Sequence, residues 1–266
     1  MIRSKRLHSA VKYGLAPLDG FARFWPQTPF IVPIESMLTL LHHPFCPHSR
    51  FVRLVLAELS LDAEMLEERV WDRREEFLEL NPGGTTPVLV EEGYPAIPGS
   101  SVIAEHLDET RGHEMGDRRL MPSDIAGRIE TRRLSSWFNE KFFEEVSGPL
   151  VSERFYKRHM RIEQGGGPPD TDSIRAARTN IRYHLAYIGW LVGRREWLAG
   201  ERLSFADLAA AAHLSSVDYL GDVPWGENEH AKVWYSRLKS RPAFRTILSD
   251  RVPGLPAAEH YADLDF

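Results

Sequence analysis

Strand-like patterns occur in only one part of this 266-residue chain, between residues 37 and 98, and they limit the fold more than any other feature. A short apolar run at Leu38, Leu40 and Leu41 indicates a buried strand. After Pro47, apolar residues recur at the i, i+3, i+4, i+7 spacing of an amphipathic helix, and residues 65–70 predict a second strand. A strand, a helix and a strand in this order favour a right-handed unit with a parallel strand pair.

The remaining patterns divide the chain into an α/β part and an all-helical part. A polar helical turn over 73–80 precedes a third strand at 87–90, a weak strand near 96–98 and a helix from Ser100. Beyond residue 111 only helical stripes follow, and Ser204 with Asp207 forms a capping box at the start of one helix. We therefore expect an α/β domain over 37–111, an all-α domain over 112–248 and a C-terminal tail over 249–266.

The first 36 residues form a separate, irregular extension. They carry five basic residues against two acidic ones, and Pro26, Pro29 and Pro33 oppose both helix interior and central strand. Met37 stands directly before the first strand, so translation starting there is one interpretation and a transit-type leader is another. In either case we expect the extension to be dispensable for the fold.

Charge and cysteine content exclude several classes of protein. A net charge of −5 argues against nucleic acid or an anionic membrane surface as the main partner, and no apolar run is long enough for membrane insertion. Cys46 is the single cysteine, so the chain cannot form an internal disulfide. The nearby histidines 42, 43 and 48 lack a recognised ligand spacing, and we expect no metal site.

Cys46 lies where the first strand ends and the first helix begins. Pro47 suits the first position of a helix, and the exposed N–H groups and dipole of that helix can stabilise a thiolate. Ser49 occupies the position of the second cysteine in Cys-X-X-Cys redox motifs, so Cys46 can form a mixed disulfide but not an internal one. Two interpretations of Cys46 remain open: a catalytic thiol and a thiol without function.

Motifs in both parts of the chain resemble the glutathione S-transferase superfamily. They are PFCPHSR, NPGGTTPVL, GSSVI, LAGERLSFADLAAA and VWYSRLKSRPAF, spread over roughly residues 37–248. The resemblance implies a thioredoxin-like N-terminal domain followed by an all-helical C-terminal domain of the transferase type. It also implies a glutathione site that includes a cis proline, at Thr86, Pro87, Val88 and Ser100.

The same resemblance leaves an enzymatic reading open. It implies a glutathione-dependent transferase or thiol reductase that uses Cys46, or Ser49 as a hydroxyl donor. However, Gly99 stands where glutathione-binding relatives usually carry an acidic residue or Gln that meets the ammonium group of glutathione. We therefore expect no required cofactor, with glutathione binding still possible.

Other features point to protein partners. A basic segment with aromatic residues includes Arg154 and Arg158, and it is either a contact for an acidic partner or an ordinary solvated helix face. Trp71, after the second strand, is either a contact anchor or core packing. The tail EHYADLDF, with Tyr261, Asp263 and Phe266, is either a docking motif or a frayed end.

The altered glutathione site, PFCPHSR, Trp71 and HYADLDF together resemble an alphaproteobacterial cell-division branch of the superfamily that binds FtsZ. This narrower resemblance implies a cytoplasmic homodimer at the division site that binds FtsZ polymer. It further implies that the tail, including Asp263, connects to the septal wall-synthesis machinery.

Overall fold

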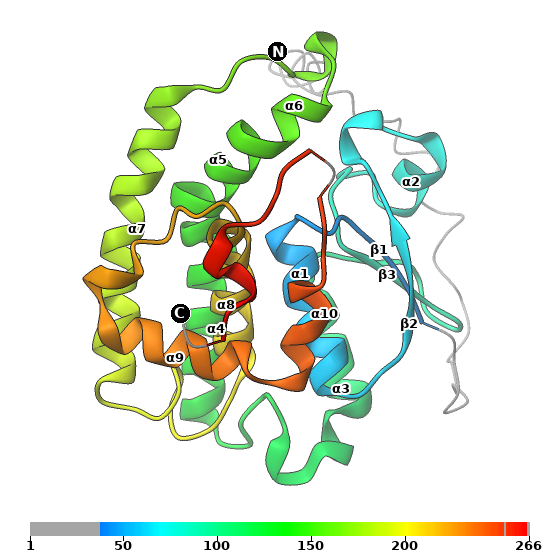
Figure 1. Ribbon diagram of the computed structural model, residues 1–266. Coiled ribbons are helices and arrows are strands. Elements are labelled where there is room, and N and C mark those ends of the chain that lie inside the picture. The colour runs from blue at the N-terminus through cyan, green and yellow to red at the C-terminus, as the bar shows by residue number, and fades with distance from the viewer. Residues whose placement is uncertain (1–37, 253, 265–266) are drawn as a thin grey trace, which may run out of the picture.

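The computed structural model describes residues 38–252 and 254–264 (Figure 1). The predicted extension over residues 1–36, Met37 and the last two residues of the tail lie outside this range. The four strands found in the described residues are β1 (Leu38–His42), β2 (Ala63–Glu67), β3 (Val88–Glu91) and β4 (Ile97–Pro98). All four fall in the segment in which the sequence predicts strands.

The strands form one mixed sheet in the order β2-β1-β3-β4. β1 and β2 pair in parallel, with Leu38 opposite Ala63, which confirms the predicted strand-helix-strand unit. β3 runs antiparallel to β1, and β4 antiparallel to β3. The second strand ends three residues earlier than predicted, because Val70 begins a 3₁₀ turn.

Three helices accompany the sheet. α1 (Pro47–Glu58) and α3 (Ser100–Arg111) pack against each other, and α1 also packs against the helical half (Figure 1). α2 (Glu75–Leu80) covers the other side of the sheet, where Phe77 packs against Leu41 and Val88. Because α1 is enclosed in this way, eight apolar and polar side chains from Ser49 to Leu56 are buried.

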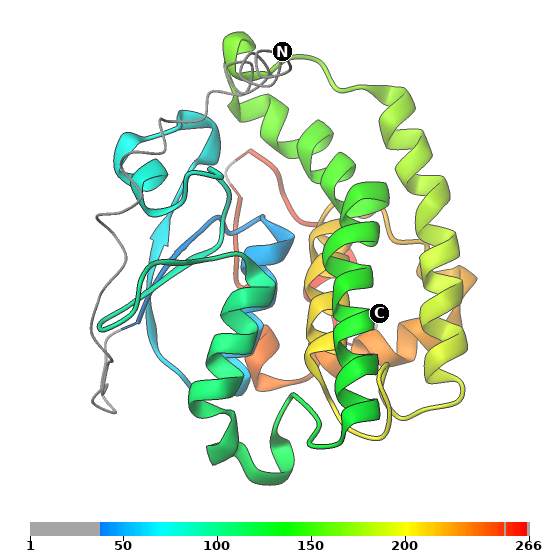
Figure 2. The same ribbon diagram turned by 180° about the vertical axis from the view of Figure 1, so that it is seen from behind.

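The helical half is built on two long rods. The first is continuous from α4 (Ile125–Ser136) through a π-helical segment (Trp137–Ser147), α5 (Gly148–Val151), a second π-helical stretch (Ser152–Tyr156) and α6 (Lys157–His159). Figure 2 shows this rod with α7 (Thr171–Val192) beside it. The predicted stripe of Leu134, Phe138 and Phe142 is buried, but the wider π-helical winding was not predicted.

The centre of the molecule is α8 (Phe205–Tyr219), of which every residue is buried. Its run Ala209–Ala212 has no long side chains, so α1 and the first rod approach it closely. The predicted capping box is confirmed, since the Asp207 carboxylate accepts the Ser204 N–H at 3.0 Å. α9 (Glu229–Lys239) and α10 (Arg245–Leu248) complete the helical half.

The described part of the tail folds back onto this core. Tyr261 is completely buried, and its hydroxyl accepts a hydrogen bond from Arg50 of α1 at 3.1 Å. Arg50 is itself fully buried and also contacts Asp250 and the Ser215 hydroxyl. The prediction of Tyr261 as part of a free docking motif or a frayed end is therefore wrong, because this side chain belongs to the core.

Candidate functional site

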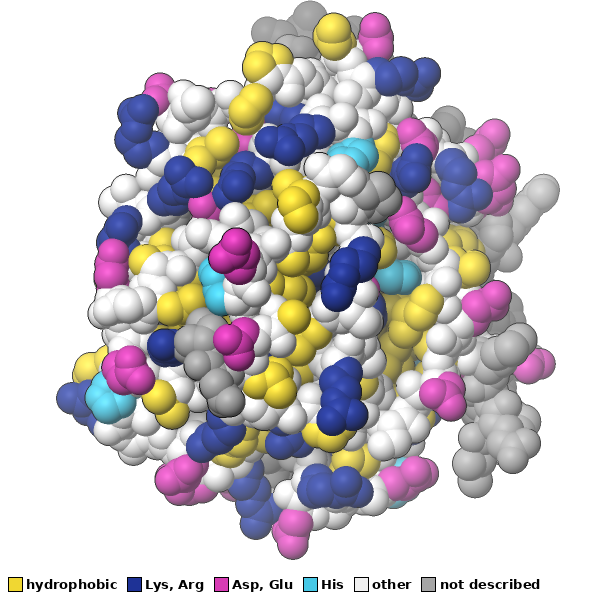
Figure 3. All heavy atoms as spheres, viewed as in Figure 1, with side chains coloured by type: hydrophobic (Ala, Val, Ile, Leu, Met, Phe, Trp, Pro, Cys, Tyr) yellow, Lys and Arg dark blue, Asp and Glu magenta, His cyan; other side chains and the backbone are white. Residues whose placement is uncertain are grey.

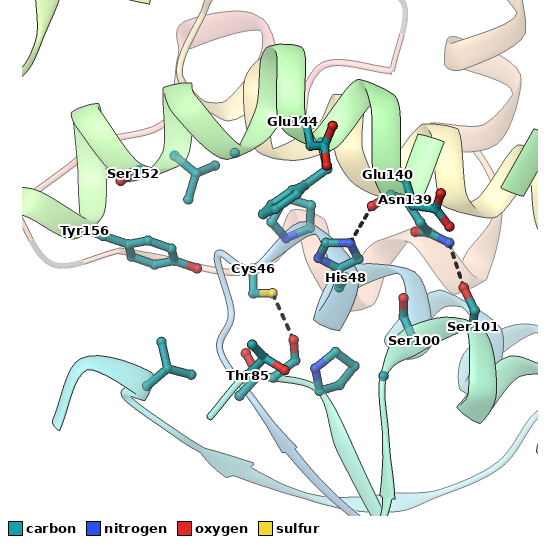
Figure 4. Close-up of a pocket in the computed structure, with 18 of the residues that line it drawn as sticks. Cys46, His48, Thr85, Ser100, Ser101, Asn139, Glu140, Glu144, Ser152 and Tyr156 are labelled. Carbon is teal, nitrogen blue, oxygen red and sulfur yellow. Dashed lines mark hydrogen bonds between the residues drawn. The ribbon is translucent and has the colours of Figure 1, made fainter. Parts of the chain in front are cut away.

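A pocket of about 710 Å³ opens between the two halves of the molecule, at the N-terminal ends of α1 and α3 (Figure 4). One wall carries Cys46, directly before α1, His48 in its first turn, the loop Thr85–Pro87 and the start of α3. The opposite wall is the first rod of the helical half, through the two π-helical stretches. The pocket thus joins chain segments that are far apart in the sequence.

Cys46 lies at the base of this pocket as the residue before α1. Its thiol donates a hydrogen bond to the Thr86 carbonyl at 3.6 Å, and the Thr86–Pro87 bond is cis, as the resemblance implied. Burial opposes ionisation of the thiol, yet hydrogen bonds and charge from His48, together with Ser49, lower the pKa of Cys46 to about 7 from its ordinary 9.0. About half of the Cys46 side chains are therefore thiolate near neutral pH.

His48 is oriented for this role. Its Nε2 donates to the Asn139 carbonyl at 2.8 Å when it carries the proton, which leaves Nδ1 toward Cys46 (Figure 4). Burial lowers the pKa of His48, but the hydrogen bond and charge of Cys46 and the hydrogen bond to the Asn139 carbonyl together outweigh burial and raise it. The ring also packs edge-on against Phe143 at 4.5 Å. Cys46 and His48 therefore each favour the charged form of the other, as in the thiolate–imidazolium pairs of activated cysteine nucleophiles.

The rod contributes a second polar group to the thiol. The Tyr156 hydroxyl points toward Cys46 in Figure 4 and hydrogen-bonds to it, while burial raises the pKa of this phenol well above its ordinary value. Tyr156 consequently stays protonated and acts as a donor. From the sequence Tyr156 belongs to the basic segment, and no local pattern links it to Cys46, so this role is not predictable from the sequence.

Two predicted site residues lie outside the pocket. Ser49 is completely buried; its hydroxyl accepts the His43 N–H at 3.3 Å and supports the Cys46 thiolate. Val88 is completely buried in β3 and does not line the cavity. The role of Ser49 as a hydroxyl donor to glutathione therefore does not fit the structure, because its buried hydroxyl binds the His43 N–H and does not line the pocket.

Ser100 and Gly99 lie at the start of α3, on the same wall as Cys46. Ser100 is 5% exposed, and its hydroxyl points into the pocket (Figure 4). Gly99 has a φ of 91°, a left-handed conformation in which a side chain is strained. Accordingly, this wall presents helix N–H groups and hydroxyls but no acid beside them to meet an ammonium group.

The rod presents acidic and apolar side chains to the pocket. Glu140 and Glu144, one turn apart, line the cavity together with Asn139 and Phe143. Sequence reasoning missed all four, since they become pocket residues only when the rod packs against α1. Among the described lining residues there is no Lys or Arg.

The predicted partner-binding residues fall in two places. Trp71 contacts Tyr156 at 5.3 Å between ring centroids, so Trp71 lies beside the basic segment, and it also packs on His43. Arg154 forms an ion pair with the buried Asp222, whereas Arg158 is exposed. Figure 3 shows basic side chains gathered at the end of the molecule formed by α5, α6 and the start of α7.

Asp263 lies in the exposed stretch that follows Tyr261. Its charge acts on His260 and Lys239, two groups that surround the buried Asp218. In the range described by the structure, no three His, Cys, Asp or Glu side chains converge as a metal site. No helix there is both long and apolar enough to cross a bilayer.

Comparisons with known proteins agree with this architecture. The glutathione S-transferase N-terminal domain matches residues 45–110, and the glutathione S-transferase C-terminal domain matches residues 168–242. Glutathione S-transferase 3 of Zea mays is 25% identical over 83% of this chain and 98% of its own length. Among solved structures, a glutathione S-transferase from Sinorhizobium meliloti is 52% identical, covers 87% of this chain with all of its own, and has a TM-score of 0.85.

A narrower similarity is equally extensive. FtsZ-localized protein A of Caulobacter vibrioides is 48% identical over 231 residues, which are 86% of this chain and 98% of that protein. The solved structure of FzlA from C. crescentus has a TM-score of 0.80, covering 86% of this chain and 100% of its own. The predicted resemblance is thereby confirmed at both levels: the chain belongs to the glutathione S-transferase superfamily and is a relative of FtsZ-localized protein A.

Proposed function

We propose that this protein is a cell-division protein with a transferase fold that binds FtsZ filaments at the division site in the cytoplasm. The observation that carries the proposal is the 48% identity to FtsZ-localized protein A over nearly the whole of that protein. The glutathione pocket supports it, because Gly99 offers no acid to a glutathione ammonium and no lining Lys or Arg in the described chain meets its carboxylates. Glutathione is then not required.

The basic end of the molecule is the proposed filament contact. Arg154 is engaged by Asp222, and Lys157 by Glu153. In the described part of the chain, Arg158 forms no ion pair, and it is exposed at the end of the first rod, two residues beyond Tyr156. An exposed, unpaired cation at this end of the molecule suits an acidic protein partner.

Co-sedimentation with GTP-assembled FtsZ tests this contact. Arg158→Glu should weaken binding at least about fivefold, since reversal replaces an attraction of roughly 1 kcal/mol by repulsion. Binding of the unchanged protein should also fall with salt. Arg118→Glu is the matched control, because Arg118 is exposed beyond the end of α3, at the opposite end of the molecule. Equal binding by both variants would reject the proposed contact, and no binding by the unchanged protein would reject the function.

We further propose a homodimer that pairs through α3 and α4. The apolar side chains of Val102, Ile125 and Ile129 are 57%, 78% and 62% exposed on these two helices. An ion pair between Glu105 of α3 and Arg132 of α4 joins the two helices. Burying such a surface favours association. Analytical ultracentrifugation should give a dimer that Ile129→Glu converts to monomer. Ile162→Glu, at an equally exposed position after α6, should leave the dimer intact; a monomeric unchanged protein contradicts the proposal.

The tail is the proposed connection to septal wall synthesis. Asp263 is exposed and available for this role, whereas Tyr261 belongs to the core. Asp263→Lys should therefore retain co-sedimentation with FtsZ while failing to support division in place of the unchanged protein. Division at the normal rate with this variant would remove Asp263 from the proposed contact.

A second function is favoured by one observation, the lowered pKa of Cys46 beside His48. A glutathione-dependent thiol reductase would use Cys46 as nucleophile and would lose activity in Cys46→Ser. This reading predicts binding of glutathione at millimolar concentration, measurable by calorimetry. The absence of binding heat and of reductase activity would leave the division function alone.

A further inference from the structure

The described tail returns to the helical half along α8 and α9 (Figure 1). The Ala258 N–H donates to the Tyr219 carbonyl at 2.9 Å, and a 3₁₀ turn over Glu259–Ala262 follows. Within this turn Tyr261 is buried in the core, whereas 35% of the His260 side chain is exposed. The turn is therefore held both by a core side chain and by a histidine that water can reach.

The partner of His260 is a buried carboxylate. The Nε2 atom of His260 lies 2.9 Å from Oδ1 of Asp218 in α8, and the Asp218 side chain is completely buried. The Trp225 indole N–H at 2.8 Å and the Tyr235 hydroxyl at 3.3 Å also donate to this carboxylate. Asp218 therefore keeps hydrogen-bond donors from the core when His260 is neutral, and the charge of His260 acts mainly on the tail.

Two further charged groups of the described chain face His260. Lys239 of α9, whose side chain is fully buried, lies 3.8 Å from Asp218, and its ammonium donates to the His260 carbonyl at 3.3 Å. Asp263 of the tail acts by its charge on both Lys239 and His260, and its N–H donates to the His260 carbonyl at 3.1 Å. Two cations balance the two carboxylates while His260 is protonated, and one negative charge is left over when His260 is neutral.

This arrangement makes the turn sensitive to pH. The hydrogen bond and charge of Asp218, together with the charge of Asp263, raise the pKa of His260 above its ordinary 6.5, against burial and the charge of Lys239. A raised pKa means that protonation stabilises the closed turn below pH 6.5, and that this stabilisation is lost as the pH rises through the pKa of the folded protein. A charge-assisted hydrogen bond to Asp218 then becomes a weaker neutral one.

We propose that His260 is a proton-controlled latch: its charged ring holds the turn Glu259–Ala262 on α8 and α9, and its neutral ring loosens the turn and frees Asp263 for a partner. The latch follows from the contacts of the turn alone. Its consequence for division rests on the proposed contact of Asp263 with septal wall synthesis, which the loosened tail makes more readily at higher pH.

The first test measures the pKa of His260 in the full-length protein. The Cε1–H signals of the histidines are followed by NMR against pH, and the signal missing in His260→Gln is that of His260. Its pKa should lie above 6.5, and Asp263→Asn should lower it. The control Asp62→Asn removes an exposed carboxylate that does not act on His260 and should leave the pKa unchanged. A pKa at or below 6.5 in the unchanged protein would overturn the proposal.

The second test follows hydrogen exchange of the amides of residues 258–264, corrected for the intrinsic effect of pH. Protection should fall as the pH rises from 6 to 9, by a factor of ten raised to the difference between the measured pKa of His260 and 6.5, because only the closed turn binds the proton more tightly. His260→Gln should keep the lower protection at every pH. His113→Gln, at an exposed histidine outside the cluster, should show the full change.

Peptides from α8 serve as the internal reference for unfolding of the core. They should stay more protected than the turn at every pH, since the turn opens without the core. Equal changes in His260→Gln and in the unchanged protein, or a turn as protected as α8, would overturn the latch. Neither measurement involves a partner, so normal division by Asp263→Lys would reject the septal contact and leave the latch in place.

Discussion

Replacement of His48 should suppress the ionisation of Cys46. In the protein the pKa of Cys46 is lowered to about 7, against burial, chiefly by the hydrogen bond and charge of His48. His48→Ala removes both and leaves burial in place, so we expect a pKa of about 9 or higher. A difference of two units corresponds to about 2.7 kcal/mol of lost thiolate stabilisation.

The rate of alkylation by iodoacetamide as a function of pH measures this change. At pH 7 the thiolate fraction should fall from about one half to about one in a hundred, while the more basic thiolate becomes roughly eightfold more nucleophilic. The net rate at pH 7 should therefore fall about sixfold, and the midpoint of the profile should move up by about two pH units. Mass spectrometry assigns the product to Cys46 without ambiguity, because the chain has no other cysteine.

Two variants separate the electrostatic effect from disturbed packing. His48→Phe keeps a ring against Phe143 but cannot hydrogen-bond, so its midpoint should move as in His48→Ala. His113→Ala, at an exposed histidine, should keep the original midpoint. If both His48 variants kept a midpoint near 7, the N-terminus of α1 would be the cause and the proposed thiolate–imidazolium pair would be refuted.

Two further predictions concern stability. Burial lowers the pKa of His43 to about 3 and of His42 to about 4, so both folded values lie below the unfolded 6.5. The stability that these two neutral histidines contribute is thus fully present above pH 6.5 and is lost as the pH falls toward 4 and 3. The variant His43→Gln should therefore reduce the slope of the unfolding free energy against pH, between pH 6 and 4, by about 1.4 kcal/mol per pH unit. An unchanged slope would contradict this prediction. The variant Asp207→Ala should lower the unfolding free energy, measured in urea, by about 3–5 kcal/mol, because the N–H groups of Leu198, Ser204 and Trp234 lose a buried acceptor. The variant Ser204→Ala, which removes only the helix cap, should lower it by about 1 kcal/mol. Equal losses in the two variants would show that the cap alone matters.

The parts of the fold that the sequence predicted are those set by local patterns. The alternation of strand and helix over 37–111, the helix starting at Pro47 and the capping box at Ser204 each depend on residues within a few positions of one another. Hydrophobic periodicity and capping chemistry report such local choices directly. Cys46 was found for the same reason, since its place at a helix start is visible in the sequence.

The parts that could not be predicted depend on distant segments. Glu140 and Tyr156 share the pocket with Cys46 only because the rod packs across the start of α1, and no pattern in their own part of the sequence shows this. Arg154 looked like a free cation because its partner Asp222 is 68 positions away. The π-helical winding of Trp137–Ser147 also escapes prediction, since the helical stripe fits an α-helix equally well.

The burial of Tyr261 determines how the chain can be shortened or labelled. A deletion that begins at residue 249, where the helical patterns end, removes a core side chain and the hydroxyl that pairs with the buried Arg50, four residues from Cys46. Such a protein would lose function through misfolding, and the result would be mistaken for loss of a signalling tail. Deletions should start after Ala262, and a reporter for imaging is better joined by a linker to the last residue than substituted for the tail.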